Sequence, residues 1–160
     1  MKYTEFSYLF NFKKKKQKNH FVSLFIKMND SFYILFPIVV IYIVAYFTNR
    51  FCQSFQDGES SSYQPPNYVF QIVWPILLYL YGLSWNQNRN NDRYKFLLFI
   101  LSFWMILYLC LGFKILSFVI LASAVYQCYQ LILDTKDNRL YFLFGWLIFA
   151  TFLNYKIIDI

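Results

Sequence analysis

Five apolar stretches, separated by polar segments, dominate this chain of 160 residues. Each stretch is about 18 to 20 residues long, enough for a helix rising about 1.5 Å per residue to cross roughly 30 Å of hydrocarbon. Backbone polar groups in lipid must be satisfied internally, so each stretch is predicted to be a helix. The expected fold is an all-α integral membrane protein, a bundle of five transmembrane helices. The predicted spans are Ser31–Thr48, Asn67–Trp85, Tyr94–Leu111, Lys114–Leu133 and Arg139–Ile158.

Composition supports the same class. Hydrophobic residues make up 59% of the chain and aromatic residues 24%, more apolar surface than a soluble domain of this length can hide. Charged residues are only 14% and cluster between the apolar runs. The chain is therefore predicted to have two parts. Residues 1–30 form a basic arm, either disordered or lying on the membrane surface, and residues 31–160 form the five-helix domain.

The net charge of +7 is concentrated in the arm, where seven of the fifteen Lys and Arg residues lie within the first 27 positions. A basic block beside a membrane span contacts anionic headgroups or sets topology, so nucleic acid is not an expected partner. The arm, the second loop and the fourth loop carry twelve of the fifteen positive charges. The positive-inside rule then places these segments on the cytosolic side and the long first loop, residues 50–66, opposite.

The chain contains few residues suited to catalysis or metal binding. Its three cysteines show no metal-like spacing, and His20 in the arm is the only histidine. Cys110 and Cys128 lie in apolar runs and are expected to pack as small hydrophobic side chains. Neither a nucleophile–base pair nor a Gly-rich phosphate loop is present in the sequence, so no enzyme and no required cofactor is predicted.

The second span carries an aromatic stripe at helical period. Its members fall within about 60° of one another on a helical wheel. They are Phe70, Trp74, Tyr81 and Trp85. Such a stripe is typical either of a packed seam between helices or of a ring-lined ligand site.

Three prolines mark the same span. Pro65 and Pro66 favour an extended approach to the helix, after which Asn67 is expected to cap the first turn. Pro75, inside the span, leaves the carbonyl of Gln71 without its usual donor and predicts a bend. A bend beside Trp74 would open space between helices.

The residues around these prolines resemble a known family. SYQPPNYVFQIVWPILLYLYG, ending at Gly82, resembles the TspO/MBR signature S-W-x-P-P-x-W-V-F/L-x-x-V-W-x-x-L-Y-x-x-M-G. GWLIFATFLNY, Gly145–Tyr155, resembles the family's A-W-L-x-F-A-T-x-L-N-Y in the last helix. The family comprises tryptophan-rich sensory proteins and translocator proteins, also called peripheral benzodiazepine receptors.

The resemblance implies a five-helix membrane protein, often a homodimer, whose cavity between helices is closed by the first loop. Family members bind porphyrins, benzodiazepine- and isoquinoline-type drugs and, in animal mitochondria, cholesterol. The residues expected to bind ligand are Tyr68, Phe70, Trp74, Trp104, Trp146, Phe149, Ala150 and Leu153. The residues expected to be structural are Pro65, Pro66, Pro75, Gly82 and Asn154. Ala150 either leaves room beside Trp146 or permits close helix packing, and Asn154 is expected to bond across helices.

The sequence departs from the family pattern in places. The third span keeps Trp104 but not the family's N-x-x-W-x-P-x-F-F run, and Tyr63 and Tyr68 replace tryptophans beside the two prolines. Lys156 directly follows Tyr155, which breaks the C-terminal pattern associated with cholesterol. A porphyrin is therefore a more suitable ligand than cholesterol.

The leading functional hypothesis is a membrane translocator or receptor that binds a flat apolar ligand, such as a porphyrin or haem-type tetrapyrrole. Two alternatives are a membrane regulatory or interaction protein that works through its lysine-rich arm, and a porphyrin-degrading activity. Expected partners are membrane lipid, the small apolar ligand and a second copy of the chain. The expected location is the mitochondrial outer membrane or another intracellular membrane for a eukaryotic or viral protein, and the cell envelope for a bacterial one.

Overall fold

The structure, a computed structural model, describes residues 31–52 and 65–158. The predicted basic arm, residues 1–30, lies outside the described residues, as does most of the long first loop. The chain divides into Met1–Phe32 and a second unit, Tyr33–Ile160, which holds the helical bundle. Everything that follows about packing concerns this second unit.

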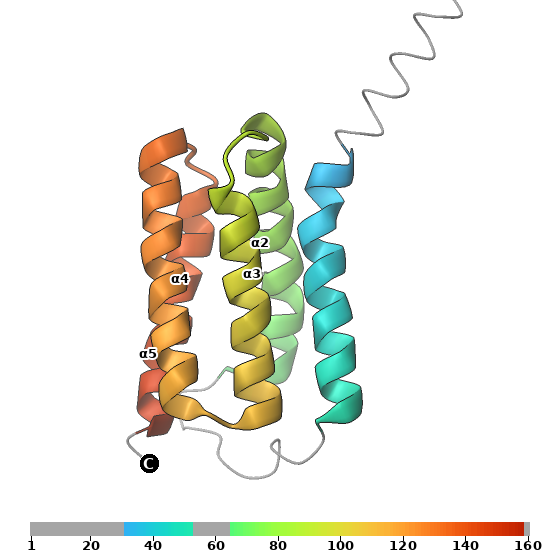
Figure 1. Ribbon diagram of the computed structural model, residues 1–160, viewed down its shortest axis with the longest axis vertical. Coiled ribbons are helices and arrows are strands. Elements are labelled where there is room, and N and C mark those ends of the chain that lie inside the picture. The colour runs from blue at the N-terminus through green and yellow to red at the C-terminus, as the bar shows by residue number, and fades with distance from the viewer. Residues whose placement is uncertain (1–30, 53–64, 159–160) are drawn as a thin grey trace, which may run out of the picture. The chain divides into compact units, whose positions relative to one another are not determined.

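The described residues form five helices in the predicted order (Figure 1). Four are long and apolar enough to cross a membrane, and the fifth has a shorter apolar part, Leu140–Lys156. The described residues include no strand. The predicted all-α, multi-pass membrane bundle is therefore confirmed. The helices are the first helix (Ser31–Phe51), α2 (Asn67–Gln87), α3 (Arg93–Ile106), α4 (Lys114–Thr135) and α5 (Leu140–Ile158).

The helix ends follow from local backbone chemistry. Pro66, with extended φ and ψ of −54° and 146°, occupies the N-cap of α2, and its carbonyl accepts a hydrogen bond from the Val69 N–H at 2.9 Å. Asn67 is thus the first helical residue and not the cap that the sequence predicted. At the other end of the bundle, Lys136 takes a left-handed conformation with φ 53°, and its N–H bonds the Ile132 carbonyl, as is common where helices end.

A π-helix, η2 (Leu107–Leu111), follows α3 directly and completes the third span. Gly112 then adopts a left-handed φ of 62°, which glycine reaches without steric cost, and α4 begins two residues later. A π turn is wider than an α turn and changes the direction in which its side chains project, and such turns are frequent at functional sites. No pattern in the sequence indicates this change of helix type.

α4 forms the centre of the core because it packs against both α3 and α5. Most of its buried residues follow one another at intervals of three or four positions, the spacing of residues on one helix face. Many large apolar side chains on the other faces are exposed, as expected for helices that face lipid. The buried positions of α4 are Ser117, Leu121, Ala124, Cys128, Leu131 and Ile132.

A disulfide bond joins the first helix to η2. Cys52, directly after the first helix, pairs with Cys110, and their Cα atoms are 4.8 Å apart, within the range that native disulfides occupy. The interpretation of Cys110 as a small hydrophobic side chain was therefore wrong, since the apolar run around Cys110 carries no information about a partner 58 positions away. Cys128 is a free, buried thiol, as predicted.

Candidate functional site

Six aromatic side chains from three helices form two groups of contacting rings, both of which start from the same face of α2 near the end of the bundle where α2 begins and α3 ends. We call them the aromatic cluster. Two come from α2, two from α3 and its π-helical continuation, and two from α5. They are Phe70, Trp74, Trp104, Tyr108, Trp146 and Phe149.

The α2 members of the aromatic cluster connect this helix to both neighbours. Phe70 meets Trp146 of α5 edge to face, with ring centroids 5.5 Å apart and an interplanar angle of 69°. Trp74, one turn further along, meets Trp104 of α3 at 6.5 Å. Phe70 and Trp74 are four residues apart and therefore lie on one face of α2. From this face one ring contacts α5 and the other contacts α3. The contacts lie within the 4.5 to 7 Å range in which aromatic pairs attract.

The rings of α3 and α5 extend the aromatic cluster along these helices. Trp104 stacks on Tyr108 of η2, with centroids 5.7 Å apart and planes 19° from parallel. Trp146 meets Phe149 at 5.5 Å. The ring pairs of the aromatic cluster therefore range from stacked, at Trp104 and Tyr108, to edge to face, at Phe70 and Trp146.

Two indole N–H groups in the aromatic cluster are buried and find no hydrogen-bond partner among the described residues. They belong to the Nε1 atoms of Trp104 and Trp146. A buried donor left unpaired costs about 1 to 3 kcal/mol, so native structures rarely keep such donors without a reason. These two donors are therefore the candidate polar groups of the aromatic cluster, since ligand sites combine apolar rings with a few polar groups.

The remaining predicted site residues of α5 lie beside Trp146. Ala150 and Leu153 are each 5% exposed and belong to the buried side of the helix. Asn154 donates from Nδ2 to the Ala150 carbonyl at 3.1 Å, a bond within its own helix. The bond across helices expected for Asn154 is not found among the described contacts.

Tyr68 does not join the aromatic cluster. It is 61% exposed, and no ring contact places it near the other predicted site residues. It lies in the first turn of α2 on a different face from Phe70 and Trp74, since neighbours two positions apart on a helix diverge by about 200°. The ligand contact expected for Tyr68 stays a prediction, and the structure places its side chain on another face of α2 than those of Phe70 and Trp74.

The predicted aromatic stripe of α2 divides into two clusters. Its second half, Tyr81 and Trp85, packs at the opposite end of α2 with Tyr94 of α3, which stacks on Trp85 at 5.9 Å and 5°. Tyr33 and Phe36 of the first helix meet Trp85 edge to face. This second group is a packed seam between helices, so the packing interpretation holds for this half of the stripe.

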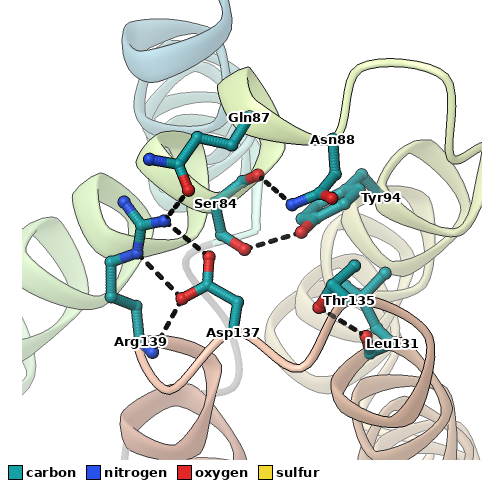
Figure 2. Close-up of polar contacts among 8 residues, drawn as sticks. All are labelled: Ser84, Gln87, Asn88, Tyr94, Leu131, Thr135, Asp137 and Arg139. Carbon is teal, nitrogen blue, oxygen red and sulfur yellow. Dashed lines mark hydrogen bonds and ion pairs between the residues drawn. The ribbon is translucent and has the colours of Figure 1, made fainter.

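Polar side chains gather beside this seam, at the ends of α2 and α4 (Figure 2). The Ser84 and Tyr94 hydroxyls share a hydrogen bond at 2.6 Å, and the buried Tyr81 hydroxyl donates to the Tyr94 carbonyl. Asn88 donates from Nδ2 to the Ser84 carbonyl at 3.0 Å. These bonds satisfy polar groups that would otherwise be costly in an apolar bundle.

An ion pair in the turn before α5 completes this polar group (Figure 2). Arg139 donates from Nε to Asp137 at 2.8 Å and from a terminal nitrogen at 2.7 Å, and the same guanidinium also contacts Gln87 of α2. The Asp137 carboxylate is only 9% exposed. Burial alone would raise the pKa of Asp137, but hydrogen bonds from Arg139 and Ser84 offset burial and hold the pKa below its ordinary value. The turn sequence DTKDN showed a polar connection but not this network.

The proposed structural residues of α2 have distinct environments. α2 runs without interruption through Pro75. Gly82 is buried against the backbone of the first helix at Ile34, a close approach that only a residue without Cβ allows.

Comparison with known proteins gives one family. The chain matches the TspO/MBR family over residues 33–159, about four fifths of its length. Comparison with curated proteins and with solved structures finds no match. The match covers the helices of the bundle unit. It includes the segments of α2 and α5 that carry the two sequence motifs. The chain belongs to the TspO/MBR family and is an integral membrane protein of the translocator or receptor type.

Proposed function

We propose that this protein binds a flat apolar ligand of the tetrapyrrole class, such as a porphyrin, in the aromatic cluster between α2, α3 and α5. The observation that carries the proposal is the pair of buried, unpaired indole N–H groups of Trp104 and Trp146 within that cluster. A porphyrin offers a planar π face for the rings and carboxylate oxygens that accept from indole donors.

The alternative of a simple packing seam does not account for these donors equally well. In the seam at the other end of α2, the hydroxyls of Tyr81, Ser84 and Tyr94 are all hydrogen-bonded. Trp85 there keeps an unpaired Nε1, but it is the one such group in that seam among the described residues. The aromatic cluster holds two, contributed by two different helices, α3 and α5.

Titration with protoporphyrin IX tests the proposal. Purified protein in detergent micelles is titrated while the porphyrin absorbance band and the tryptophan fluorescence are followed. Trp104→Phe and Trp146→Phe each keep a ring but remove the indole donor, and we expect each to weaken binding roughly two- to tenfold, the worth of one hydrogen bond. Protoporphyrin IX dimethyl ester, which lacks ionised carboxylates, should bind the wild type more weakly and lose part of this sensitivity.

Trp85→Phe is the matched control. It removes the same chemical group, a buried and unpaired indole N–H, from a tryptophan at the far end of α2 and should leave the affinity unchanged. Equal affinities for wild type, Trp104→Phe and Trp146→Phe would refute the site. So would a loss in Trp85→Phe as large as in the other two.

The proposed role is binding and not catalysis. The aromatic cluster presents rings and indole donors, and no acid–base pair lies within it. We expect illumination to bleach the absorbance of bound porphyrin no faster than that of porphyrin in protein-free micelles. Faster bleaching with protein, abolished in Trp146→Phe, would instead support a degrading activity.

A further inference from the structure

The Cys52–Cys110 disulfide is connected to the aromatic cluster through the short π-helix η2. Cys110 and Tyr108 both lie in the five-residue π-helix η2. Tyr108 stacks on Trp104, whose buried indole N–H is one of the two unpaired donors. The position of the Trp104 ring therefore depends on η2, and the disulfide fixes the end of η2 to the end of the first helix.

The same bond sits where the first loop leaves the bundle. Cys52 is the residue directly after the first helix, and the loop of residues 53–64 leads from it to Pro65 and α2. The disulfide thus joins the start of this loop to the helix that carries Trp104. No other described covalent link connects the first helix to the site.

The disulfide is also within reach of small reagents. Both cysteines are partly exposed, and they line an open groove of about 320 Å³ between the first helix and α3. Cys128, by contrast, is fully buried in the core. The groove is almost entirely apolar, and its other lining residues are Ile43, Val44, Phe47, Thr48, Phe51 and Ile106.

We propose that the Cys52–Cys110 bond is a redox-controlled clasp that raises the affinity of the aromatic cluster for its ligand. This inference rests on the proposed function. A dithiol reductant opens the clasp by exchange: one thiolate attacks a disulfide sulfur, the second displaces the mixed disulfide, and two protein thiols and one oxidised reductant result. A disulfide oxidant reverses these steps, with the same two electrons and two protons.

The direction of the effect follows from pre-organisation. With the bond closed, η2 and the rings of Tyr108 and Trp104 are held in place before the ligand arrives. With the bond open, ligand binding must order these side chains, at a cost that lowers affinity roughly two- to tenfold for one or two rings. The oxidised protein is therefore the high-affinity form.

Protoporphyrin IX titrations of oxidised and dithiothreitol-reduced protein test the clasp. We expect the reduced wild type to bind roughly two- to tenfold more weakly, and reoxidation to restore the affinity. The double variant Cys52→Ser/Cys110→Ser should bind protoporphyrin IX like the reduced protein, and dithiothreitol should not change its affinity. Cys128→Ser, which removes the only other cysteine among the described residues, should respond to dithiothreitol as the wild type does.

Each outcome decides the proposal. Equal affinity of oxidised and reduced wild type, with both forms binding, refutes the clasp and leaves the proposed function intact. Free thiols at Cys52 and Cys110 in protein purified without reductant, detected by intact mass after alkylation, also refute it. If the oxidised protein does not bind porphyrin, the proposed function fails and the clasp fails with it. Reduction of folded wild type provides the comparison even if the double variant does not fold.

Discussion

Gly82 of α2 lies directly against the backbone of Ile34 in the first helix. A Cβ at position 82 would stand 2.8 Å from the Ile34 Cα and nearer still to its carbonyl oxygen. Real side chains never approach backbone that closely, so the two helices can meet here only because position 82 is glycine.

Gly82→Ala should therefore destabilise the bundle. The added methyl group forces the first helix away from α2, and overpacking of this kind costs about 1 to 3 kcal/mol. Thermal unfolding in detergent micelles, followed by the loss of helical circular dichroism, measures the effect. Gly145→Ala is the matched control, because a Cβ there meets nothing within 4 Å. It should leave stability unchanged or raise it by up to about 1 kcal/mol through helix propensity.

Tyr94→Phe should lower stability by about 1 to 3 kcal/mol. It removes the hydroxyl that shares a hydrogen bond with the fully buried Ser84, and it leaves that serine without this partner. The Tyr81 bond to the Tyr94 backbone carbonyl should survive. A double-mutant cycle with Ser84→Ala isolates the pair, since the interaction energy should disappear once either partner is gone. Additive effects of the two substitutions would show that the bond contributes nothing.

Stability should fall in acid through Asp137. Its pKa is lowered in the folded protein, so the folded state binds its proton less readily than the unfolded chain. The stabilisation is complete above the ordinary carboxyl value of 3.8 and is lost as pH falls through the lower folded pKa. Asp137→Asn should cost about 1 to 3 kcal/mol at neutral pH and almost nothing in strong acid.

Asp92→Asn provides the comparison for this measurement. Asp92 pairs with Lys95, but their side chains are 84% and 63% exposed, and surface pairs of this kind contribute little. The stability of the Asp92→Asn variant should therefore depend on pH in the same way as the stability of the wild type. A pH-independent difference between Asp137→Asn and wild type would contradict the role given to the carboxylate.

Cleavage after glutamate should reveal the disulfide directly. Glu5 and Glu59 are the only glutamates in the chain, and Glu59 falls between Cys52 and Cys110. Digestion of denatured, alkylated protein with a glutamate-specific protease should leave residues 6–59 and 60–160 joined on a non-reducing gel and separate them on a reducing one. Separation under both conditions would mean that the bond is absent.

The bundle was predictable from sequence because hydrophobic length alone determines which segments can cross a bilayer. The boundaries moved by a few residues where polar positions still fit into a last turn. The first helix runs on through Asn49 and Arg50 to Phe51, and α2 extends beyond Trp85 to Gln87. Side chains this polar are tolerated at helix ends because they reach the headgroup region.

The candidate site was predictable only in part. Periodicity placed Phe70 and Trp74 on one face, and the two motifs supplied Trp146 and its neighbours. Periodicity cannot show which helix each ring meets, so it did not separate the Tyr81 and Trp85 seam from the aromatic cluster. Tyr68 belongs to the same motif but lies on another face of α2, because a motif conveys proximity in sequence and not helix phase. Pairing of cysteines and the onset of a π turn depend on tertiary contacts that no local pattern records.

The bond between Cys52 and Cys110 has a consequence for biogenesis. It closes a covalent ring that contains α2 and α3, and it can form only after the ends of the first and third spans have arrived at the same face of the membrane. A chain in which either the second or the third span failed to cross would keep the two thiols on opposite sides of the bilayer. Oxidation of this pair therefore marks molecules in which α2 and α3 have crossed the membrane together.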